Sequence, residues 1–277
     1  MKKKHLAYPY LIWSVIFIIV PLILILYYSV TEKVDGRTVF TLKHFMEFFD
    51  FKNNSYYLVL LRSLKLAFYC TVVCLFIGYP TAYCLSKLKP GMRNFLILLI
   101  VLPMWMNFLL RTYSWLTLLE RNGLINKLLM MLNLPMLDIL YTETAVVLGM
   151  VYNYLPFMVL PIYSVIIKID RSLIQASEDL GANPLQTFRK VTLPLSMPGI
   201  ASGITMVFMP STTTFAISKL LGGGKVVLIG DLIEQQFNVA HNWGFGSALS
   251  VVLIVIILLT MSFMTRFEQE KDGGVLF

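Results

Sequence analysis

The sequence predicts an all-α polytopic membrane protein with six transmembrane helices in one transmembrane domain over residues 1–277. Hydrophobic residues make up 57% of the chain and charged residues 14%, and the mean hydropathy is +0.74. Average soluble domains are less apolar and carry about 25% charged residues. Uncharged apolar runs also recur along the chain, and about 20 such residues suffice to cross the hydrocarbon core of a bilayer. A length of 277 residues fits one bundle of spans.

The first apolar run, Leu6 to Thr31, follows a basic tail from Met1 to His5. It is longer than the core of a signal peptide and lacks an obvious small-residue cleavage site, so we interpret it as a retained span. The other runs are judged by the same length rule. The expected spans are residues 9–30, 66–86, 95–118, 144–167, 195–218 and 246–265.

Prolines lie inside several of these runs, at Pro80, Pro103, Pro156 and Pro210. A proline removes one backbone hydrogen bond from a helix and usually kinks it. We therefore expect a kink at Pro80 and hinges or gates at Pro103, Pro156 and Pro210. Arg111 lies near the outer end of the third run, where we expect its long side chain to reach the lipid headgroups.

The distribution of basic residues predicts the orientation of the chain. Lys and Arg are denser in the segments that precede the odd-numbered spans or follow the sixth, and the short turn from Lys87 to Arg93 is basic without any acidic residue. Because cytoplasmic loops are enriched in Lys and Arg, both termini and the segment between the fourth and fifth spans are expected in the cytoplasm.

The segment at residues 169–194, named here the two-helix loop, begins with the signals of a short amphipathic helix. Ser172 and Gln175 have the spacing of an N-cap and its third-position partner. Gly181 follows where a left-handed residue commonly ends a helix. We therefore predict a helix over residues 172–180.

A second short helix is predicted directly afterwards. Asn183 is a good N-cap, Pro184 occupies the first helical position, and Gln186 lies three residues after the cap. Pro194 is expected to end this helix. Apolar residues recur at three-residue spacing at Leu185, Phe188 and Val191. A solvent-facing linker has no reason to carry two capped helices with apolar faces, so we predict an element that packs against something.

Several other classes of protein find no support. The stretch at residues 221–226 lacks the glycine spacing and the Ser or Thr of a phosphate-binding loop, and neither a zinc-protease motif nor a nucleophile elbow occurs. Three isolated histidines indicate no metal site, and the three cysteines lie in one apolar run as packing residues. The net charge of +8 has no accompanying nucleic-acid-binding motif.

The spans contain no acidic residue at mid-membrane depth, which argues against a proton-coupled carrier. Polar residues do occur, at Asn107, Asn153 and Ser211 to Thr214. They fit either hydrogen bonds between helices or a weakly polar pathway that passes a solute without holding it.

The two-helix loop resembles the signature loop of binding-protein-dependent ABC importer permeases. The family pattern is E-A-A, three residues, Gly, nine residues, an aliphatic residue, one further residue and L-P. Ala176, Gly181, Val191 and the Leu193-Pro194 pair match in register. The sequence departs from the pattern at the first and third positions, which hold Gln175 and Ser177 here. An ion pair made by the family's leading Glu is therefore not available at that position.

Most of the chain is similar to the B-type permeases of spermidine/putrescine importers. The stretches that carry this resemblance are residues 78–83, 102–113, 154–163, 179–188, 193–200, 220–230 and 243–248. The resemblance implies the type I ABC importer permease fold in a bacterial inner membrane. It also implies a homologous second permease subunit, a cytoplasmic ATPase dimer that binds ATP and Mg²⁺, and an extracytoplasmic polyamine-binding protein. No cofactor is expected on this chain.

The resemblance implies that the two-helix loop couples the permease to the ATPase. The coupling residues are expected to be Gln175, Ala176, Ser177, Gly181, Leu185, Phe188, Val191, Leu193 and Pro194. Aromatic faces attract ammonium groups. Pathway residues for a polyamine are accordingly expected to be Trp105, Asn107, Tyr113, Tyr152, Asn153, Tyr154 and Thr213. The alternatives are an importer of the same architecture for sulfate or ferric iron, a self-powered carrier or channel, and a membrane enzyme.

Overall fold

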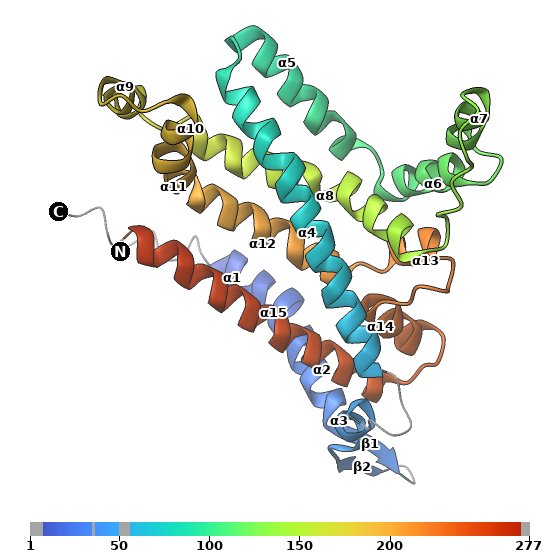
Figure 1. Cartoon of the computed structure of the whole chain (residues 1–277). Helices are drawn as coiled ribbons and strands as arrows, with labels where there is room; N and C mark the ends of the chain where they lie inside the picture. Colours follow the sequence, from blue (N-terminus) through green and yellow to red (C-terminus); the bar gives the residue numbers. More distant parts are fainter. Residues whose placement is uncertain (1–7, 35–36, 50–55, 273–277) are drawn as a thin grey trace. The chain divides into compact units, whose positions relative to one another are not determined.

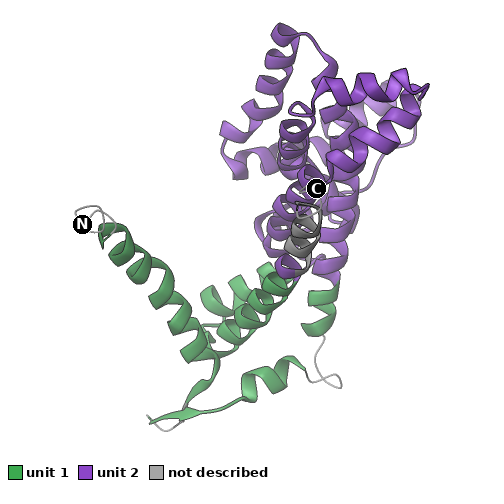
Figure 2. Cartoon of the chain, turned by 90° about the vertical axis from the view of Figure 1, so that its left-hand side faces the viewer, with its two compact units in different colours: residues 1–61, 229–259 green, residues 62–228, 260–277 purple. Residues whose placement is uncertain are grey.

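The computed structural model describes residues 8–34, 37–49 and 56–272, with side chains described over residues 8–32, 37–49 and 56–262 (Figure 1). The basic tail from Met1 to His5 and the last five residues of the chain lie outside this description. The chain divides into two compact units (Figure 2). Unit 1 comprises residues 1–61 and 229–259, and unit 2 comprises residues 62–228 and 260–277.

Unit 1 begins with one long apolar helix built from α1, η2 and α2, whose middle turn is a π-helix. A short antiparallel hairpin of β1 and β2 follows, in which Thr31 pairs with Phe40 and Val34 with Arg37. Helix α3 follows this hairpin, which no pattern in the sequence indicated. The bounds are α1 Tyr8–Ser14, η2 Val15–Ile19, α2 Val20–Ser29, β1 Thr31–Val34, β2 Arg37–Phe40, α3 Lys43–Phe48, α14 Ile229–Asn238 and α15 Trp243–Asp272.

Unit 2 holds most of the buried core and the two-helix loop. Two elements cross the boundary, because α4 begins in unit 1 and α15 ends in unit 2. The remaining bounds are α4 Tyr56–Lys87, α5 Pro90–Val101, η3 Leu102–Trp105, α6 Phe108–Leu119, α7 Leu124–Met131, α8 Glu143–Ile166, α9 Arg171–Asp179, α10 Pro184–Thr187, η4 Phe188–Thr192, α11 Leu193–Leu195, α12 Met197–Thr213 and α13 Ala216–Leu221.

Four helices in the described residues are each long and apolar enough to cross a membrane: Tyr8–Ser29, Tyr56–Lys87, Glu143–Ile166 and Trp243–Ser262. They fall on the first, second, fourth and sixth predicted spans, and α4 extends ten residues further toward the N-terminus than predicted. The third and fifth predicted spans fall on helix pairs bent by 96° and 61°. Each bent pair is either a broken span or a re-entrant loop, so six crossings remain a prediction.

The prolines differ in their effect on the helices. The 96° break lies between Trp105 and Phe108, directly after the 3-10 turn that contains Pro103, where a hinge was expected. Helix α4 continues through Pro80, and α8 continues through Pro156. Helix α12 continues past Pro210 to Thr213, three residues beyond the expected interruption. Of these four prolines, only Pro103 lies next to a break in the helix.

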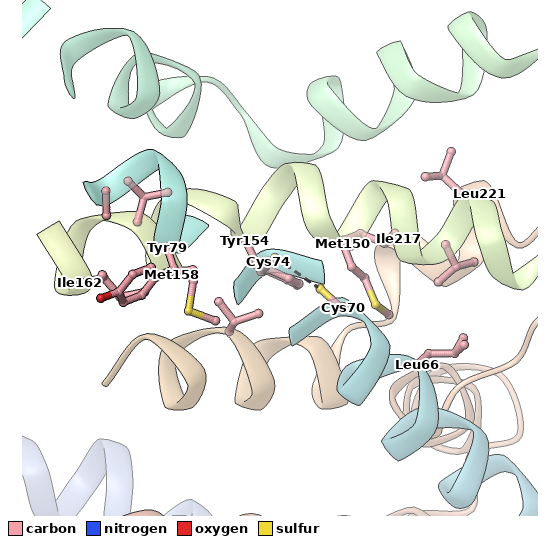
Figure 3. Packing of buried hydrophobic residues seen from close by; sticks show 14 of the residues in the cluster. Leu66, Cys70, Cys74, Tyr79, Met150, Tyr154, Met158, Ile162, Ile217 and Leu221 are labelled. Atoms are coloured by element: carbon pink, nitrogen blue, oxygen red, sulfur yellow. Dashed lines mark hydrogen bonds between the residues drawn. The ribbon is translucent and has the colours of Figure 1, made fainter. Parts of the chain in front are cut away.

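The core of unit 2 is formed by α4, α8, α12 and α13. Cys70 and Cys74 on α4, Met158 on α8 and Ile217 on α13 are fully buried in it (Figure 3). Helices α8 and α12 approach closely at Gly199, where an added Cβ would lie only 3.0 Å from the Ile162 Cα. All three cysteines are free thiols, with Cys84 exposed. The core thus fixes the end of α12 to which the two-helix loop is attached.

Candidate functional site: the two-helix loop

The first helix of the loop, α9, begins one residue earlier than predicted, and its N-cap is Asp170 rather than Ser172. The Asp170 carboxylate accepts the backbone N–H of Ser172 at 2.9 Å. This hydrogen bond holds the pKa of the Asp170 carboxyl below its usual value. Asp170 rather than Ser172 is the N-cap, because its charged oxygen also interacts favourably with the helix dipole.

Helix α9 ends at a left-handed glycine, as predicted. Gly181 has φ of +80°, its N–H donates to the Glu178 carbonyl at 2.9 Å, and the Ala182 N–H donates to the Ser177 carbonyl at 3.0 Å. These two bonds make a Schellman motif, which satisfies carbonyls that the helix end leaves open. A Cβ at Gly181 would meet nothing within 4 Å, so the backbone angle alone requires glycine.

The second helix begins with the predicted capping box. The Asn183 side chain accepts the Gln186 N–H at 2.9 Å, and the Gln186 side chain accepts the Asn183 N–H at 2.9 Å. The two helices are then joined by a side-chain hydrogen bond of 2.9 Å between the hydroxyls of Ser177 and Thr187. The loop is therefore a folded unit rather than a flexible connection.

Contrary to prediction, Pro194 does not end the second helix. Residues Phe188–Thr192 form a π-turn, in which the Leu193 N–H donates to the Phe188 carbonyl, and helical backbone continues to Leu195. A proline cannot donate to the carbonyl four residues before it and crowds that group, and a wider π-turn relieves this conflict. The bend of 61° comes after Leu195, where Ser196 separates this helix from α12.

Phe188 packs within the chain. Its ring lies edge-on to Tyr79 and Tyr83 of α4, with centroid distances of 5.8 and 5.2 Å. The Tyr79 hydroxyl also forms a 2.9 Å hydrogen bond with the Ser196 hydroxyl. These contacts fix the second helix of the loop to α4, more than a hundred residues earlier in the sequence.

The other predicted coupling residues divide by exposure. Val191 and Leu193 are half-buried, and Ser177 is half-buried at its bond to Thr187. Gln175, Ala176, Pro194 and Leu185 are exposed, with Leu185 at 73%. Leu180, which was not singled out from the sequence, is 89% exposed. Leu180 and Leu185 are thus two exposed large apolar side chains that flank the Gly181 turn in sequence, and they are called here the apolar surface around Gly181.

The predicted pathway residues do not form one cluster. Tyr154 and Thr213 meet at the carbonyl of Pro210, to which their hydroxyls donate at 3.3 and 3.4 Å. The Asn153 amide is buried and donates to the Gly149 carbonyl at 2.8 Å, while its Oδ1 has no hydrogen-bond partner in the described part of the chain. Tyr152 lies edge-on to Trp115 at 5.3 Å.

Of the remaining three pathway candidates, Trp105 and Asn107 lie at the 96° break and Tyr113 lies within α6. Trp105 is 79% exposed, Tyr113 is exposed, and Asn107 caps α6 by accepting the N–H groups of Leu109 and Leu110. Arg111 is buried on α6 rather than extended toward headgroups, and its Nε has no hydrogen-bond partner among the described residues.

Several long apolar helices, with a folded loop anchored to their ends, are the features of a multi-span membrane protein. The chain belongs to the family of binding-protein-dependent transport system inner membrane components, whose sequence model matches residues 74–272. Membership of this family makes the chain an inner-membrane component of a transport system.

Curated relatives cover nearly the full length. The Haemophilus influenzae protein named spermidine/putrescine transport system permease protein PotB is 41% identical over 270 residues, covering 95% of this chain and 93% of the relative. The Escherichia coli K12 protein of the same name is 39% identical over 268 residues, covering 95% and 96%. The Escherichia coli inner membrane ABC transporter permease protein YdcU is 33% identical over 228 residues, covering 77% and 72%.

Solved structures support the fold. A chain of the bacterial alginate ABC transporter in complex with its pentasaccharide-bound periplasmic protein superposes with a TM-score of 0.78 at 17% identity, covering 96% of this chain and 93% of that chain. A chain of the MetNI methionine ABC transporter in an inward-facing conformation superposes with a TM-score of 0.57 at 17% identity, covering 76% and 93%. The predicted type I ABC importer permease fold is confirmed.

Proposed function

We propose that this chain is a membrane-spanning permease subunit of an ATP-driven importer of polyamines. The observation that carries the proposal is the similarity to two spermidine/putrescine permeases, at 41% and 39% identity over 95% of the chain. Similarity that extends over the whole length includes the helices that line a pathway as well as the loop that couples it.

The two-helix loop would dock onto the ATPase through the apolar surface around Gly181. Leu180 and Leu185 are its most exposed large side chains. Fully burying each would contribute roughly 1.5–3 kcal/mol to the interface. Phe188, also among the expected coupling residues, packs its ring on α4, so its part in coupling would be to connect the loop to α4.

The chain carries no nucleotide-binding motif of its own, so ATP and Mg²⁺ would act on a partner ATPase dimer. A homologous second permease would supply the other half of the pathway. An extracytoplasmic binding protein would deliver the cargo, and both termini would lie in the cytoplasm. Docking at the two-helix loop would convert closure of the ATPase dimer into helix movement.

The pathway would use aromatic faces rather than fixed carboxylates. The polar group formed by Tyr154, Thr213 and the Pro210 carbonyl offers oxygen acceptors to an ammonium group. The exposed rings of Trp105 and Tyr113 offer cation–π contacts, worth about 0.5–2 kcal/mol each. Contacts of this size pass a polycation onward without holding it tightly.

Uptake of radiolabelled spermidine by proteoliposomes tests the proposal, with the complete complex reconstituted, ATP inside and binding protein outside. Uptake is expected only when both are present. Leu180→Ser with Leu185→Ser should abolish it, whereas Met131→Ser, at an 80% exposed position on α7, should not. Uptake of sulfate or ferric iron in place of spermidine would refute the cargo. Spermidine uptake without ATP would refute the importer mechanism.

A further inference from the structure

A cavity of about 530 Å³ lies in unit 2 between the two-helix loop and the ends of α4, α5 and α8. Helix α4 contributes Tyr83 and Lys87, and α5 contributes Arg93. The loop contributes Arg171, Gln175 and Glu178 among others. The cavity is therefore lined both by the ends of long apolar helices and by the loop that follows them.

The cavity carries a net positive charge. Lys87, Arg93 and Arg171 face one acidic side chain, Glu178. Within the described part of the chain none of the three cations forms an ion pair. The Arg93 Nε is buried without a hydrogen-bond partner there, and the Lys87 Nζ lies 4.3 Å from the centroid of the Tyr83 ring. A buried, unpaired guanidinium nitrogen is costly, so this arrangement favours an external acceptor.

The sign of the charge excludes the proposed cargo, because a polycation would be repelled by three unpaired cations. The position indicates which anion fits. Lys87 ends a 32-residue apolar helix, and Arg93 lies in the first turn of the next one, so both lie where helices leave the hydrocarbon core. Basic pockets between membrane helices at this depth bind anionic headgroups, and arginine matches phosphate oxygens in geometry.

We propose that this cavity binds a phosphate-bearing anion, supplied by the headgroup of an anionic phospholipid. The phosphate would accept hydrogen bonds from Arg93 and pair with Lys87 and Arg171, while Gln175 adds a neutral amide. A ligand held by α4, α5 and α9 at once would brace the loop against the ends of these helices. The site is separate from the apolar surface around Gly181, because neither Leu180 nor Leu185 lines the cavity.

Retained lipid can be counted directly by native mass spectrometry of the full-length chain, purified with its associated subunits from detergent containing phosphatidylglycerol. Each basic side chain near an anionic surface contributes about 1 kcal/mol, or roughly a fivefold change in retention. Lys87→Gln and Arg93→Gln should each lower retention by that factor, and Gln175→Glu should lower it by adding a negative charge. Lys89→Gln is the matched control, since Lys89 is exposed in the same turn but does not line the cavity.

A second arm separates the two sources of phosphate. The lipid-free complex is titrated with inorganic phosphate while its thermal unfolding is followed. Stabilisation that is lost in Arg93→Gln but kept in Lys89→Gln would support the site with a soluble anion as its ligand. Equal lipid retention in all variants, together with no Arg93-dependent response to phosphate, overturns the proposal. So does loss of the ATPase subunit from Arg93→Gln without any loss of lipid, because the cavity would then hold an acidic side chain of the partner. Neither readout involves transport, so failure of the polyamine proposal leaves this test intact.

Discussion

Gly181 provides a sharp test of the two-helix loop, because its substitution isolates the backbone angle from all other effects. Its φ of +80° lies in the left-handed region, and a Cβ there would meet no atom within 4 Å. Gly181→Ala therefore introduces no clash, only the cost of a left-handed alanine, which is about 1–2 kcal/mol. That cost corresponds to roughly a 5–30-fold shift away from the native turn.

The assay is the ratio of substrate-stimulated to basal ATPase activity in the reconstituted complex. Gly181→Ala should lower this ratio, since the turn orients the exposed Leu180 and Leu185 toward the ATPase. Gly181→Asn should lower it less, because asparagine tolerates the left-handed region. Gly224 supplies a matched control, with φ of +75° and no atom within 4 Å of an added Cβ, outside the two-helix loop.

Gly224→Ala should leave the ATPase ratio unchanged although it carries a similar backbone cost. The reasoning is refuted if Gly224→Ala and Gly181→Ala lower the ratio equally, because the effect would then come from general destabilisation. It is also refuted if Gly181→Asn is as damaging as Gly181→Ala, because the backbone angle would then not be the cause.

Three further predictions concern the anchoring of the loop, the core beneath it and the cap of α9. Tyr79→Phe removes the hydroxyl that is hydrogen-bonded to Ser196 and should destabilise the complex by about 0.5–1.5 kcal/mol. The measurement is the midpoint of thermal unfolding, which should fall. An unchanged midpoint would show that this hydrogen bond does not contribute to stability. Gly199→Ala should lower the free energy of unfolding by about 1–3 kcal/mol, because the added methyl overpacks α8 against α12. Gly91→Ala should be tolerated, because the space around Gly91 is open. Equal stability of the two variants would contradict the close approach of α8 and α12. The lowered pKa of Asp170 means that its cap stabilises α9 above the ordinary carboxyl value of 3.8 and loses this effect as pH falls through the lower folded value. Hydrogen exchange in α9 should therefore show no loss of this cap between pH 5 and 8. Asp170→Asn keeps a capping oxygen but has no carboxyl to protonate, so it should abolish the loss of α9 protection in acid; an unchanged acid response would contradict the role of the Asp170 carboxylate.

Local signals in the sequence predicted local structure well. The capping box at Asn183 and Gln186 formed as expected, because both partners lie within one turn and need no other part of the chain. Gly181 ended α9 for the same reason. At the start of α9 two residues could act as caps, and the serine was chosen from its spacing to Gln175. The structure uses Asp170, whose charge at the helix N-terminus adds to its hydrogen bond.

The errors concern contacts made far along the sequence. The three-residue spacing of Leu185 and Phe188 predicted one apolar face. Phe188 instead meets Tyr79 and Tyr83, and a π-turn begins at this residue. Arg111 was placed near the outer end of a straight span, but the chain bends by 96° before α6 and the Arg111 side chain is buried. Neither a bend nor a partner a hundred residues away leaves a periodic signal in the local sequence.

The position of Phe188 changes how force would pass through the proposed importer. Sequence reasoning connected the loop only to α8 and α12, the two helices that it joins. The ring of Phe188 also packs on Tyr79 and Tyr83, and Tyr79 bonds to Ser196 at the bend before α12. A displacement at the exposed Leu185 therefore cannot move α12 without either moving α4 or breaking these contacts. In the proposed mechanism α4 would therefore move together with α8 and α12, and Tyr79 on α4 would take part in coupling.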